Sequence, residues 1–124
     1  MSGGDRAQQR VAAARAYVDA LVSHDPSGVP LHPDCTRVEF GLKTGRNGPH
    51  IARSLARGPQ FRVIHRVSDF TATVDGHSVT TRYVVHVRPK LLGLGAPVSE
   101  TFVVDDENRI RAIVARFGFP RRQG

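Results

Sequence analysis

The chain opens with an apolar stripe at the spacing of a helix. Within residues 5–23, apolar side chains recur every three or four positions: Ala14, Tyr17, Val18 and Leu21. This period is typical of an amphipathic helix, and Pro26 ends it because a proline disfavours helical geometry at the residue before it. We therefore predict a long first helix over residues 5–23, preceded by a disordered start over residues 1–4.

The middle of the chain is predicted to hold short elements. Two prolines in residues 27–34 allow at most a short, broken helix there. Residues 35–40 suit a short strand, and the turn-forming residues 44–49 separate that strand from an amphipathic helix over residues 50–57. A Gly-Pro pair then ends this second helix.

From residue 60 onward, apolar and polar residues alternate with the two-residue period of strands. Strands are predicted over residues 60–67, 70–74, 78–87, 98–104 and 109–119. Asp75-Gly76 is a strong hairpin turn, whereas the Gly- and Pro-rich residues 88–97 suit a longer connection. Residues 121–124 are expected to be a solvated tail.

This order of elements predicts a single α+β domain over residues 5–120, in which helices cover one face of a curved antiparallel sheet. A chain of 124 residues is long enough for one core, and that core must rest on aliphatic side chains because Trp is absent. A sheet that wraps around the first helix makes a cone, whose open end suits a small-molecule pocket.

The cysteine content and the hydropathy of the chain limit where we expect the protein to work. The lone Cys35 cannot form an intrachain disulfide, which fits a reducing compartment. No apolar run approaches the roughly 20 residues needed to cross a bilayer, and the polar residues 1–10 lack the apolar segment of a signal peptide. We expect a cytoplasmic protein that does not bind membranes.

A net charge of +7 raises the question of nucleic-acid binding. The arginines are scattered over many predicted elements, and the chain has neither a long basic run nor the aromatic-and-basic motif of a single-strand binder. We therefore expect no nucleic-acid partner and ascribe the charge to a solvated surface.

Two of the eleven acidic residues stand out by their position. Nine lie in polar ends, turns or a helix flank, whereas Glu39 and Glu100 lie inside apolar strand-like runs. Glu100 shares a strand face with Phe102, because side chains two apart point the same way. A carboxyl group in such a place must pair, face a cavity or stay protonated.

Ion pairs offer a second interpretation of both carboxylates. Glu39 has Arg37 two residues away on the same strand face. Glu100 would pair with Arg116 or Arg82 across strands if it lay on the outer face of the sheet.

The histidines give a further set of candidates. His65 and His86 are each flanked by valine and would face the cavity from adjacent strands, as a base or a polar anchor. The more common outcome for such histidines is a structural role in which both ring nitrogens are satisfied. No pair of histidines has metal-ligand spacing, so we expect no metal site.

Four short segments together resemble one family. Residues 16–25, 34–39, 96–102 and 114–118 are similar, in order and spacing, to segments of the bacterial ketosteroid isomerases and the related SnoaL-like, polyketide-cyclase-like proteins of the nuclear-transport-factor-2-like superfamily. The match at 34–39 requires a deletion of about two residues in the preceding broken helix. The resemblance implies a cone-like, cystatin-like α+β barrel without a cofactor.

The resemblance also implies roles for three residues. Glu39 would be the base that moves a proton on a carbon next to a carbonyl, while Tyr17 and a protonated Glu100 would donate hydrogen bonds to the enolate oxygen. The surrounding pocket would be lined by Val38, Phe40, His65, His86, Phe102 and Phe117. The expected partners are a small apolar molecule and a second copy of the chain, held through the outer sheet face.

The sequence departs from the isomerase pattern and keeps other functions open. Both acids are glutamates where the family has aspartates, and Tyr83 falls in a mid-sheet strand where it is not expected to support Tyr17. Tyr17 could also be an ordinary core residue. The alternatives are a non-catalytic ligand-binding or dimerisation module, and an epoxide or lactone hydrolase in which Asp69 with Arg82, or Glu39 with Arg37, activates water.

Overall fold

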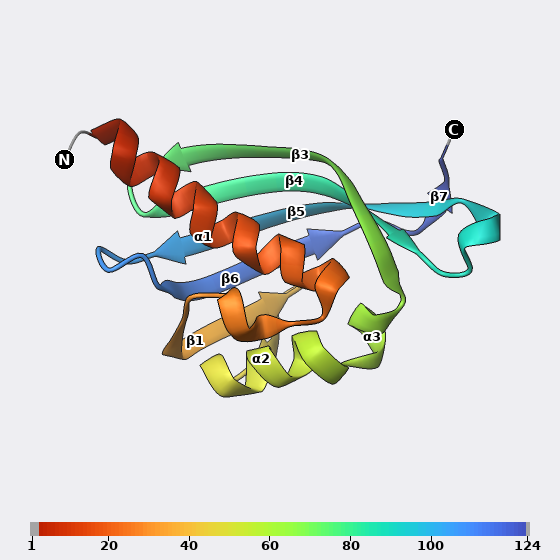
Figure 1. Ribbon diagram of the computed structural model, residues 1–124, viewed down its shortest axis with the longest axis horizontal. Helices are drawn as coiled ribbons and strands as arrows, with labels where there is room; N and C mark the ends of the chain where they lie inside the picture. The colour runs from red at the N-terminus through yellow and green to blue at the C-terminus, as the bar shows by residue number, and fades with distance from the viewer. Residues whose placement is uncertain (1–2, 124) are drawn as a thin grey trace.

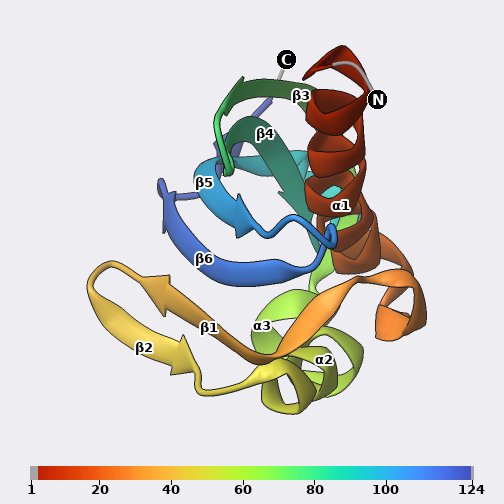
Figure 2. The same ribbon diagram turned by 90° about the vertical axis from the view of Figure 1, so that its left-hand side faces the viewer.

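The computed structural model describes residues 3–123 and has a long helix, α1 (Gly3–Ser23), lying along the concave side of a curved sheet (Figures 1 and 2). The predicted stripe is the buried side of this helix: Ala14, Tyr17, Val18 and Leu21 are all buried. The ring of Tyr17 packs edge-on against Phe102 of the sheet at 5.3 Å between ring centres. The hydrophobic stripe thus fixes how α1 sits on the sheet.

Within residues 3–123 the sheet has seven strands, which are in chain order β1 (Leu31–Glu39), β2 (Leu42–Gly45), β3 (Ile64–Asp75), β4 (Ser78–Val87), β5 (Leu94–Val104), β6 (Ile110–Phe117) and β7 (Arg121–Arg122). Their spatial order is β2-β1-β6-β5-β4-β3, with β7 paired to β5. β1 runs parallel to β6, and the other pairs are antiparallel. The predicted α+β cone is confirmed, with a mixed rather than purely antiparallel sheet.

Two short helices close one end of the cone beside β1 (Figure 1). α2 (Gly48–Arg57) begins where the Asn47 side chain accepts a hydrogen bond from the backbone of His50 and ends at Gly58. α3 (Pro59–Arg62) follows at once. The prediction of a strand over residues 60–67 was therefore wrong for residues 60–63, and β3 begins only at Ile64. The helix forms because Pro59 is well suited to its first position.

Three segments that were predicted to interrupt the strands are shorter in the structure than expected. The broken helix at 27–34 is only a 3₁₀ turn (Pro26–Gly28), and β1 already begins at Leu31. The connection at 88–97 holds a second 3₁₀ turn (Lys90–Leu92), and β5 begins at Leu94. β3 runs through the gap predicted at residues 68–69, where Asp69 adopts a positive φ of 58° and the register shifts. A bulge of this kind lets one strand continue where the alternation fails.

The ends of the chain are more ordered than predicted. Of the disordered start expected over residues 1–4, residues 1–2 lie outside the described residues, whereas Gly3 and Gly4 belong to α1. Of the tail expected over residues 121–124, residue 124 lies outside them, and β7 pairs with Leu94 and Gly95 of β5. Among residues 3–123, no helix is long and apolar enough to cross a membrane.

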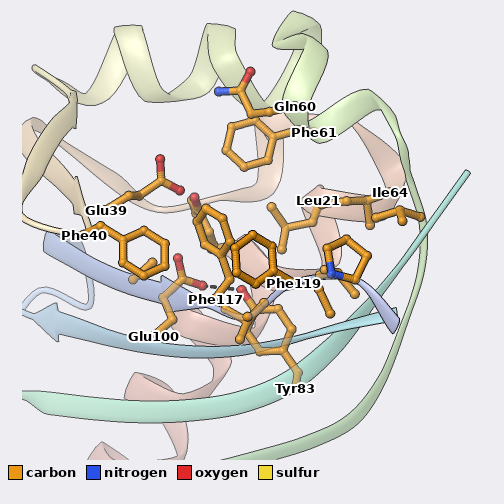
Figure 3. Close-up of a pocket in the computed structure, with 18 residues that line it drawn as sticks. Leu21, Glu39, Phe40, Gln60, Phe61, Ile64, Tyr83, Glu100, Phe117 and Phe119 are labelled. Atoms are coloured by element: carbon orange, nitrogen blue, oxygen red, sulfur yellow. Dashed lines mark hydrogen bonds between the residues drawn. The ribbon is translucent and has the colours of Figure 1, made fainter. Parts of the chain in front are cut away.

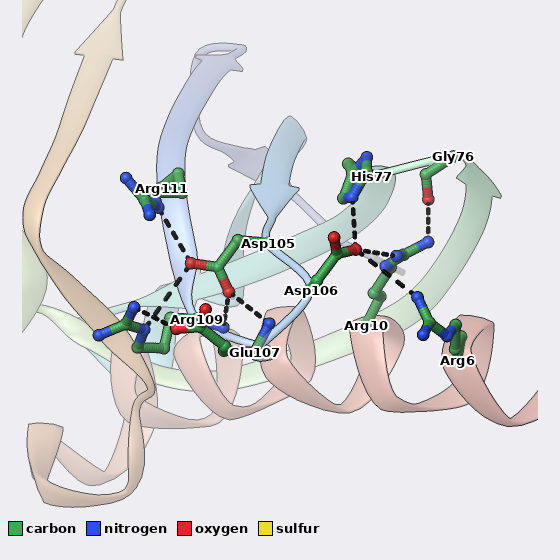
Figure 4. Close-up of polar contacts among 9 residues, drawn as sticks. All are labelled: Arg6, Arg10, Gly76, His77, Asp105, Asp106, Glu107, Arg109 and Arg111. Carbon is green, nitrogen blue, oxygen red and sulfur yellow. Dashed lines mark hydrogen bonds and ion pairs between the residues drawn. The ribbon is translucent and has the colours of Figure 1, made fainter. Parts of the chain in front are cut away.

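A cluster of ion pairs fastens the start of α1 to two turns of the sheet (Figure 4). Asp106, in the turn between β5 and β6, lies 2.8 Å from Nε2 of His77, 3.4 Å from Arg10 and 3.6 Å from Arg6. Arg10 also donates to the carbonyl of Gly76 at 2.7 Å. These contacts are exposed to solvent, so each adds little to the free energy of folding.

Candidate functional site

A pocket of about 500 Å³ lies inside the cone, between the sheet, the end of α1 and α3 (Figure 3). Most of its wall is aliphatic or aromatic. Five of the lining residues have polar side chains: Tyr17, Glu39, Gln60, Tyr83 and Glu100. A cavity of this size with an apolar wall and a few convergent polar groups has the character of a small-molecule site.

Tyr17, Glu39 and Glu100 line this one pocket although they come from α1, β1 and β5. Glu39 is the last residue of β1, and its side chain is 16% exposed at the rim. Glu100 lies deeper and is 3% exposed. Figure 3 shows both carboxyl groups turned toward the same hollow. The interpretation of Glu100 as an outer-face residue paired with Arg82 or Arg116 is therefore excluded.

Glu100 and Tyr83 form a buried pair on neighbouring strands. The hydroxyl of Tyr83 donates a short hydrogen bond to Oε1 of Glu100. Burial raises the pKa of Glu100 from 4.5 to about 7, against the lowering effect of the Tyr83 hydrogen bond. Burial, followed by the nearby charge of Glu100, also raises the pKa of Tyr83 well above its ordinary value. Near neutral pH, a large share of Glu100 is thus protonated and has a proton to donate from its second oxygen.

The hydroxyl of Tyr17 accepts a hydrogen bond from a fully buried arginine. Nη1 of Arg37 donates to the Tyr17 hydroxyl oxygen at 3.2 Å. Among the described residues, no acceptor takes the proton of that hydroxyl, which lies at the pocket wall. The pKa of Tyr17 is raised far above its usual value, first by burial and then by Glu100, while Arg37 opposes the rise. Tyr17 is therefore a neutral hydrogen-bond donor.

The guanidinium of Arg37 is anchored by neutral groups. Its Nε donates to Oγ1 of Thr44 at 3.1 Å, and its Nη2 donates to the carbonyl of Thr44 at 3.2 Å and to Oγ of Ser54 at 3.0 Å. The cation also lies 4.9 Å from the ring centre of Phe61. Oε1 of Glu39 is 4.0 Å from Nε. The predicted contact between Arg37 and Glu39 thus coexists with the place of Glu39 in the pocket.

Two of the six residues predicted to line the pocket do so. Phe40 and Phe117 face each other at its exposed rim, with their ring centres 4.8 Å apart. Phe102 is fully buried behind Tyr17, so it supports the wall without forming it. Val38 lies between Arg37 and Glu39 on β1 and points to the opposite side, because side chains alternate along a strand.

His65 and His86 must also be corrected, because neither lines the pocket. Ile64 lines it on β3, and Val85 and Val87 line it on β4, so the histidines between or beside them point to the outer face. There, Arg66 donates to Nδ1 of His86, whose Nε2 lies 2.7 Å from Oγ of Ser68.

The direction of these outer-face hydrogen bonds excludes a serine nucleophile. A guanidinium only donates, so Nδ1 of His86 accepts and Nε2 carries the proton toward Ser68. Ser68 in turn donates to Asp69 at 3.0 Å. Burial and the charge of Arg66 lower the pKa of His86. The histidine is a satisfied structural residue, as the second interpretation had it. Within residues 3–123, no group of three potential ligands could hold a metal ion.

Two site residues, Tyr83 and Arg37, were not predicted, although the sequence carried a signal for each of them. Tyr83 follows Val79 and Thr81 on one face of β4, and the neighbouring strand carries Glu100 on that same face. Tyr83 supports Glu100, to which it donates a hydrogen bond, whereas the hydroxyl of Tyr17 is supported by Arg37. Arg37 was considered only as a partner of Glu39, although its place in an inward-facing pair also predicts burial.

The sequence matches, over residues 4–117, the family described as a domain of unknown function (DUF8021). A comparison with curated protein sequences finds no match. An LEH-like epoxide hydrolase from M. tuberculosis superposes with a TM-score of 0.67 at 24% identity, over 91% of this chain and 85% of that chain.

Other solved structures share the fold. A steroid delta-isomerase from Pseudomonas aeruginosa gives a TM-score of 0.63 at 20% identity, over 90% of this chain and 80% of that chain. A protein of the SnoaL-like family from Agrobacterium tumefaciens gives 0.68 at 16% identity, over 90% and 99%. Neighbours described as NTF2-like and cystatin-like agree, so the chain has the nuclear-transport-factor-2-like fold predicted from its sequence.

Proposed function

The chain belongs to the DUF8021 family, and we propose that its pocket catalyses a cofactor-free proton transfer on a small apolar carbonyl compound. One observation carries this proposal: Tyr17, Glu39 and Glu100 line a single pocket whose remaining wall is almost entirely apolar. Such a wall excludes water, which strengthens each interaction with a charge that forms inside. The fold hosts many activities, so the proposal rests on the site and not on the neighbours.

Glu39 is the base in this reaction. Its carboxylate takes a proton from the carbon next to the carbonyl, so that a C–H bond breaks and an O–H bond forms. The electron pair moves onto the carbonyl oxygen and gives an enolate. Glu39 then returns the proton to another carbon of the conjugated system, which completes an isomerisation without loss of atoms. Its place at the rim, at the end of β1, gives it access to a substrate carbon.

Tyr17 and Glu100 stabilise the enolate oxygen. The hydroxyl of Tyr17 keeps its own proton free because Arg37 occupies a lone pair of the same oxygen. Glu100 accepts from Tyr83 through Oε1, so a proton on Oε2 is free for the substrate. Donors aimed at an oxygen that becomes charged stabilise the transition state more than the neutral substrate, and they raise the rate for that reason.

The test combines turnover with a binding probe. A β,γ-unsaturated apolar ketone is incubated with the protein, and formation of the conjugated product is followed by absorbance. Glu39→Gln is expected to lower the rate by about 10²–10⁴-fold, and Tyr17→Phe by about 10²–10³-fold. Glu107→Gln makes the same chemical change in an exposed turn and should leave the rate unaltered.

A phenol whose absorbance reports ionisation supplies the second measurement. The proposal expects the pocket to bind the ionised phenol as a mimic of the enolate. A protein that turns over no ketone and binds no phenolate, and whose Glu39→Gln and Tyr17→Phe variants are at least as stable as the wild type, is a non-catalytic module.

Opening of an apolar epoxide by water is a second candidate function. Arg37 beside Glu39 favours it, because a carboxylate held near a guanidinium can orient and deprotonate a water molecule. That water would form the new C–O bond, and a protonated Glu100 would give its proton to the departing epoxide oxygen. Incorporation of ¹⁸O from labelled water into a diol, dependent on both glutamates, would favour this reaction over isomerisation.

A further inference from the structure

We infer that Arg37 is a positioning residue for the proposed proton transfer and acts through the Tyr17 hydroxyl. Its positive charge stays close to the negative charge, which moves during the reaction from Glu39 to the substrate oxygen. This inference rests on the proposed function. Arg37 does not line the pocket itself, so it cannot touch the substrate and is not a catalytic residue. Its influence passes through the two pocket residues beside it, Tyr17 and Glu39.

The partners of Arg37 hold its orientation without neutralising its charge. Every hydrogen bond that it donates goes to a neutral oxygen, on Tyr17, Thr44 or Ser54. Among residues 3–123, the one carboxylate within ion-pair distance is that of Glu39, at 4.0 Å from Nε. A fully buried cation needs a counter-charge, and the carboxylate of Glu39 is placed to supply it before the reaction begins.

The reaction moves this counter-charge but does not remove it. When Glu39 takes the proton it becomes neutral, and the negative charge appears on the substrate oxygen that the Tyr17 hydroxyl contacts. Arg37 is hydrogen-bonded to that hydroxyl at 3.2 Å. The guanidinium of Arg37 therefore lies near the negative charge both before the proton transfer, on Glu39, and after it, on the substrate oxygen. A substrate that carries its own negative charge would break this balance, so the favoured substrate is a neutral carbonyl compound.

The hydrogen bond from Arg37 also directs and strengthens the donor. It occupies one lone pair of the Tyr17 oxygen, which leaves the hydroxyl proton for the pocket. A chain of hydrogen bonds that begins at a cation polarises each successive donor. The surroundings are shaped for this contact: a Cβ at Gly45 of β2 would come within 2.9 Å of Cβ of Arg37 and 2.5 Å of Ile51. Only glycine lets β2 pack this closely over the arginine.

The experiment measures ionisation of a bound phenol in a Glu39→Gln background, because a neutral residue at position 39 imitates the state in which the base holds the proton. Full-length Glu39→Gln protein is titrated with nitrophenols of graded acidity, and absorbance gives the ionised fraction of the bound probe. Adding Arg37→Met is expected to raise the pKa of the bound phenol by about one to two pH units. Arg37→Lys keeps the charge and should raise it by less.

Arg82→Met is the matched control, because it removes an exposed arginine of β4 whose side chain alternates away from the inward-facing Tyr83. It should leave the ionisation of the bound phenol unchanged. Thermal unfolding is recorded for every variant, since an arginine that only braces β1 against α2 would lower the melting temperature without altering the probe.

The two possible failures can be told apart. If the Glu39→Gln protein binds no phenolate, the proposed function is overturned, and the role of Arg37 with it. In the second failure, the Glu39→Gln protein binds phenolate while the Arg37 variant that folds, Met or Lys, leaves the ionised fraction of the bound phenol unchanged. In that case only the role of Arg37 is rejected. A rise in the pKa of the bound phenol, larger for Met than for Lys, supports it.

Discussion

Glu100 should make the protein less stable as the pH rises from about 4.5 to 7. Its pKa is about 7 in the folded protein, raised mainly by burial, against an ordinary value of 4.5. Between these values the unfolded chain has released the proton and the folded chain still holds it. Stability falls wherever the folded state binds more protons than the unfolded state.

The size of the effect follows from the same two values. At about 1.4 kcal/mol per pH unit, their difference corresponds to about 3 kcal/mol of unfolding free energy. This stability is fully present below pH 4.5, is lost as the pH rises through 7, and stays lost above it. Glu100→Gln removes the titration but keeps an oxygen that can accept the hydrogen bond from Tyr83.

Urea unfolding followed by circular dichroism, from pH 4 to pH 8.5, measures this difference. Glu100→Gln and the wild type should have similar stability at pH 4, and the variant should be more stable by about 3 kcal/mol at pH 8. Other groups titrate in both proteins and cancel in the comparison. Glu107→Gln in the exposed turn should run parallel to the wild type. Parallel curves for Glu100→Gln as well would refute a buried carboxyl with a raised pKa.

Four further outcomes are expected. Tyr83→Phe removes a hydrogen bond that lowers the pKa of Glu100. Because only protonated Glu100 donates to the enolate, the rate of isomerisation should fall at high pH, and in this variant the fall should occur at a higher pH. Phe117→Ala, at the half-exposed rim, should weaken binding of an apolar ligand about tenfold or more, with less than about 1 kcal/mol lost in unfolding free energy. Asp106→Asn should lower the unfolding free energy only slightly in urea unfolding, and by less in high salt, because the ion pairs of Asp106 are exposed. The His77 hydrogen bond lowers the pKa of Asp106, so this difference from the wild type should vanish as the pH falls through that pKa. Light scattering at micromolar concentration should give about twice the 13.6 kDa chain mass if the outer sheet face joins two copies, and a monomer mass would reject that expectation.

The candidate site was partly visible in the sequence because two carboxylates occupy positions that apolar residues usually fill. Glu39 and Glu100 were singled out because they lie inside apolar strand-like runs, and Tyr17 by the helical stripe together with the family resemblance. His65 was misplaced because β3 begins at Ile64 after a helical turn, and a shift of one residue exchanges the two faces of a strand. His86 was misplaced although β4 was predicted with its correct bounds, because its neighbours Val85 and Val87 take the inward face.

Local pattern alone determined the long first helix, the alternating strands, the hairpin turn at Asp75-Gly76 and the presence of two acids within apolar strands, because these depend on neighbours a few residues away. Tertiary structure decided what those acids meet. The pairing of β4 with β5 brings Tyr83 to Glu100, and the packing of α1 and α2 around β1 encloses Arg37 between Tyr17, Thr44 and Ser54. Contacts between segments far apart in the chain depend on register, curvature and burial together, and no local period encodes them.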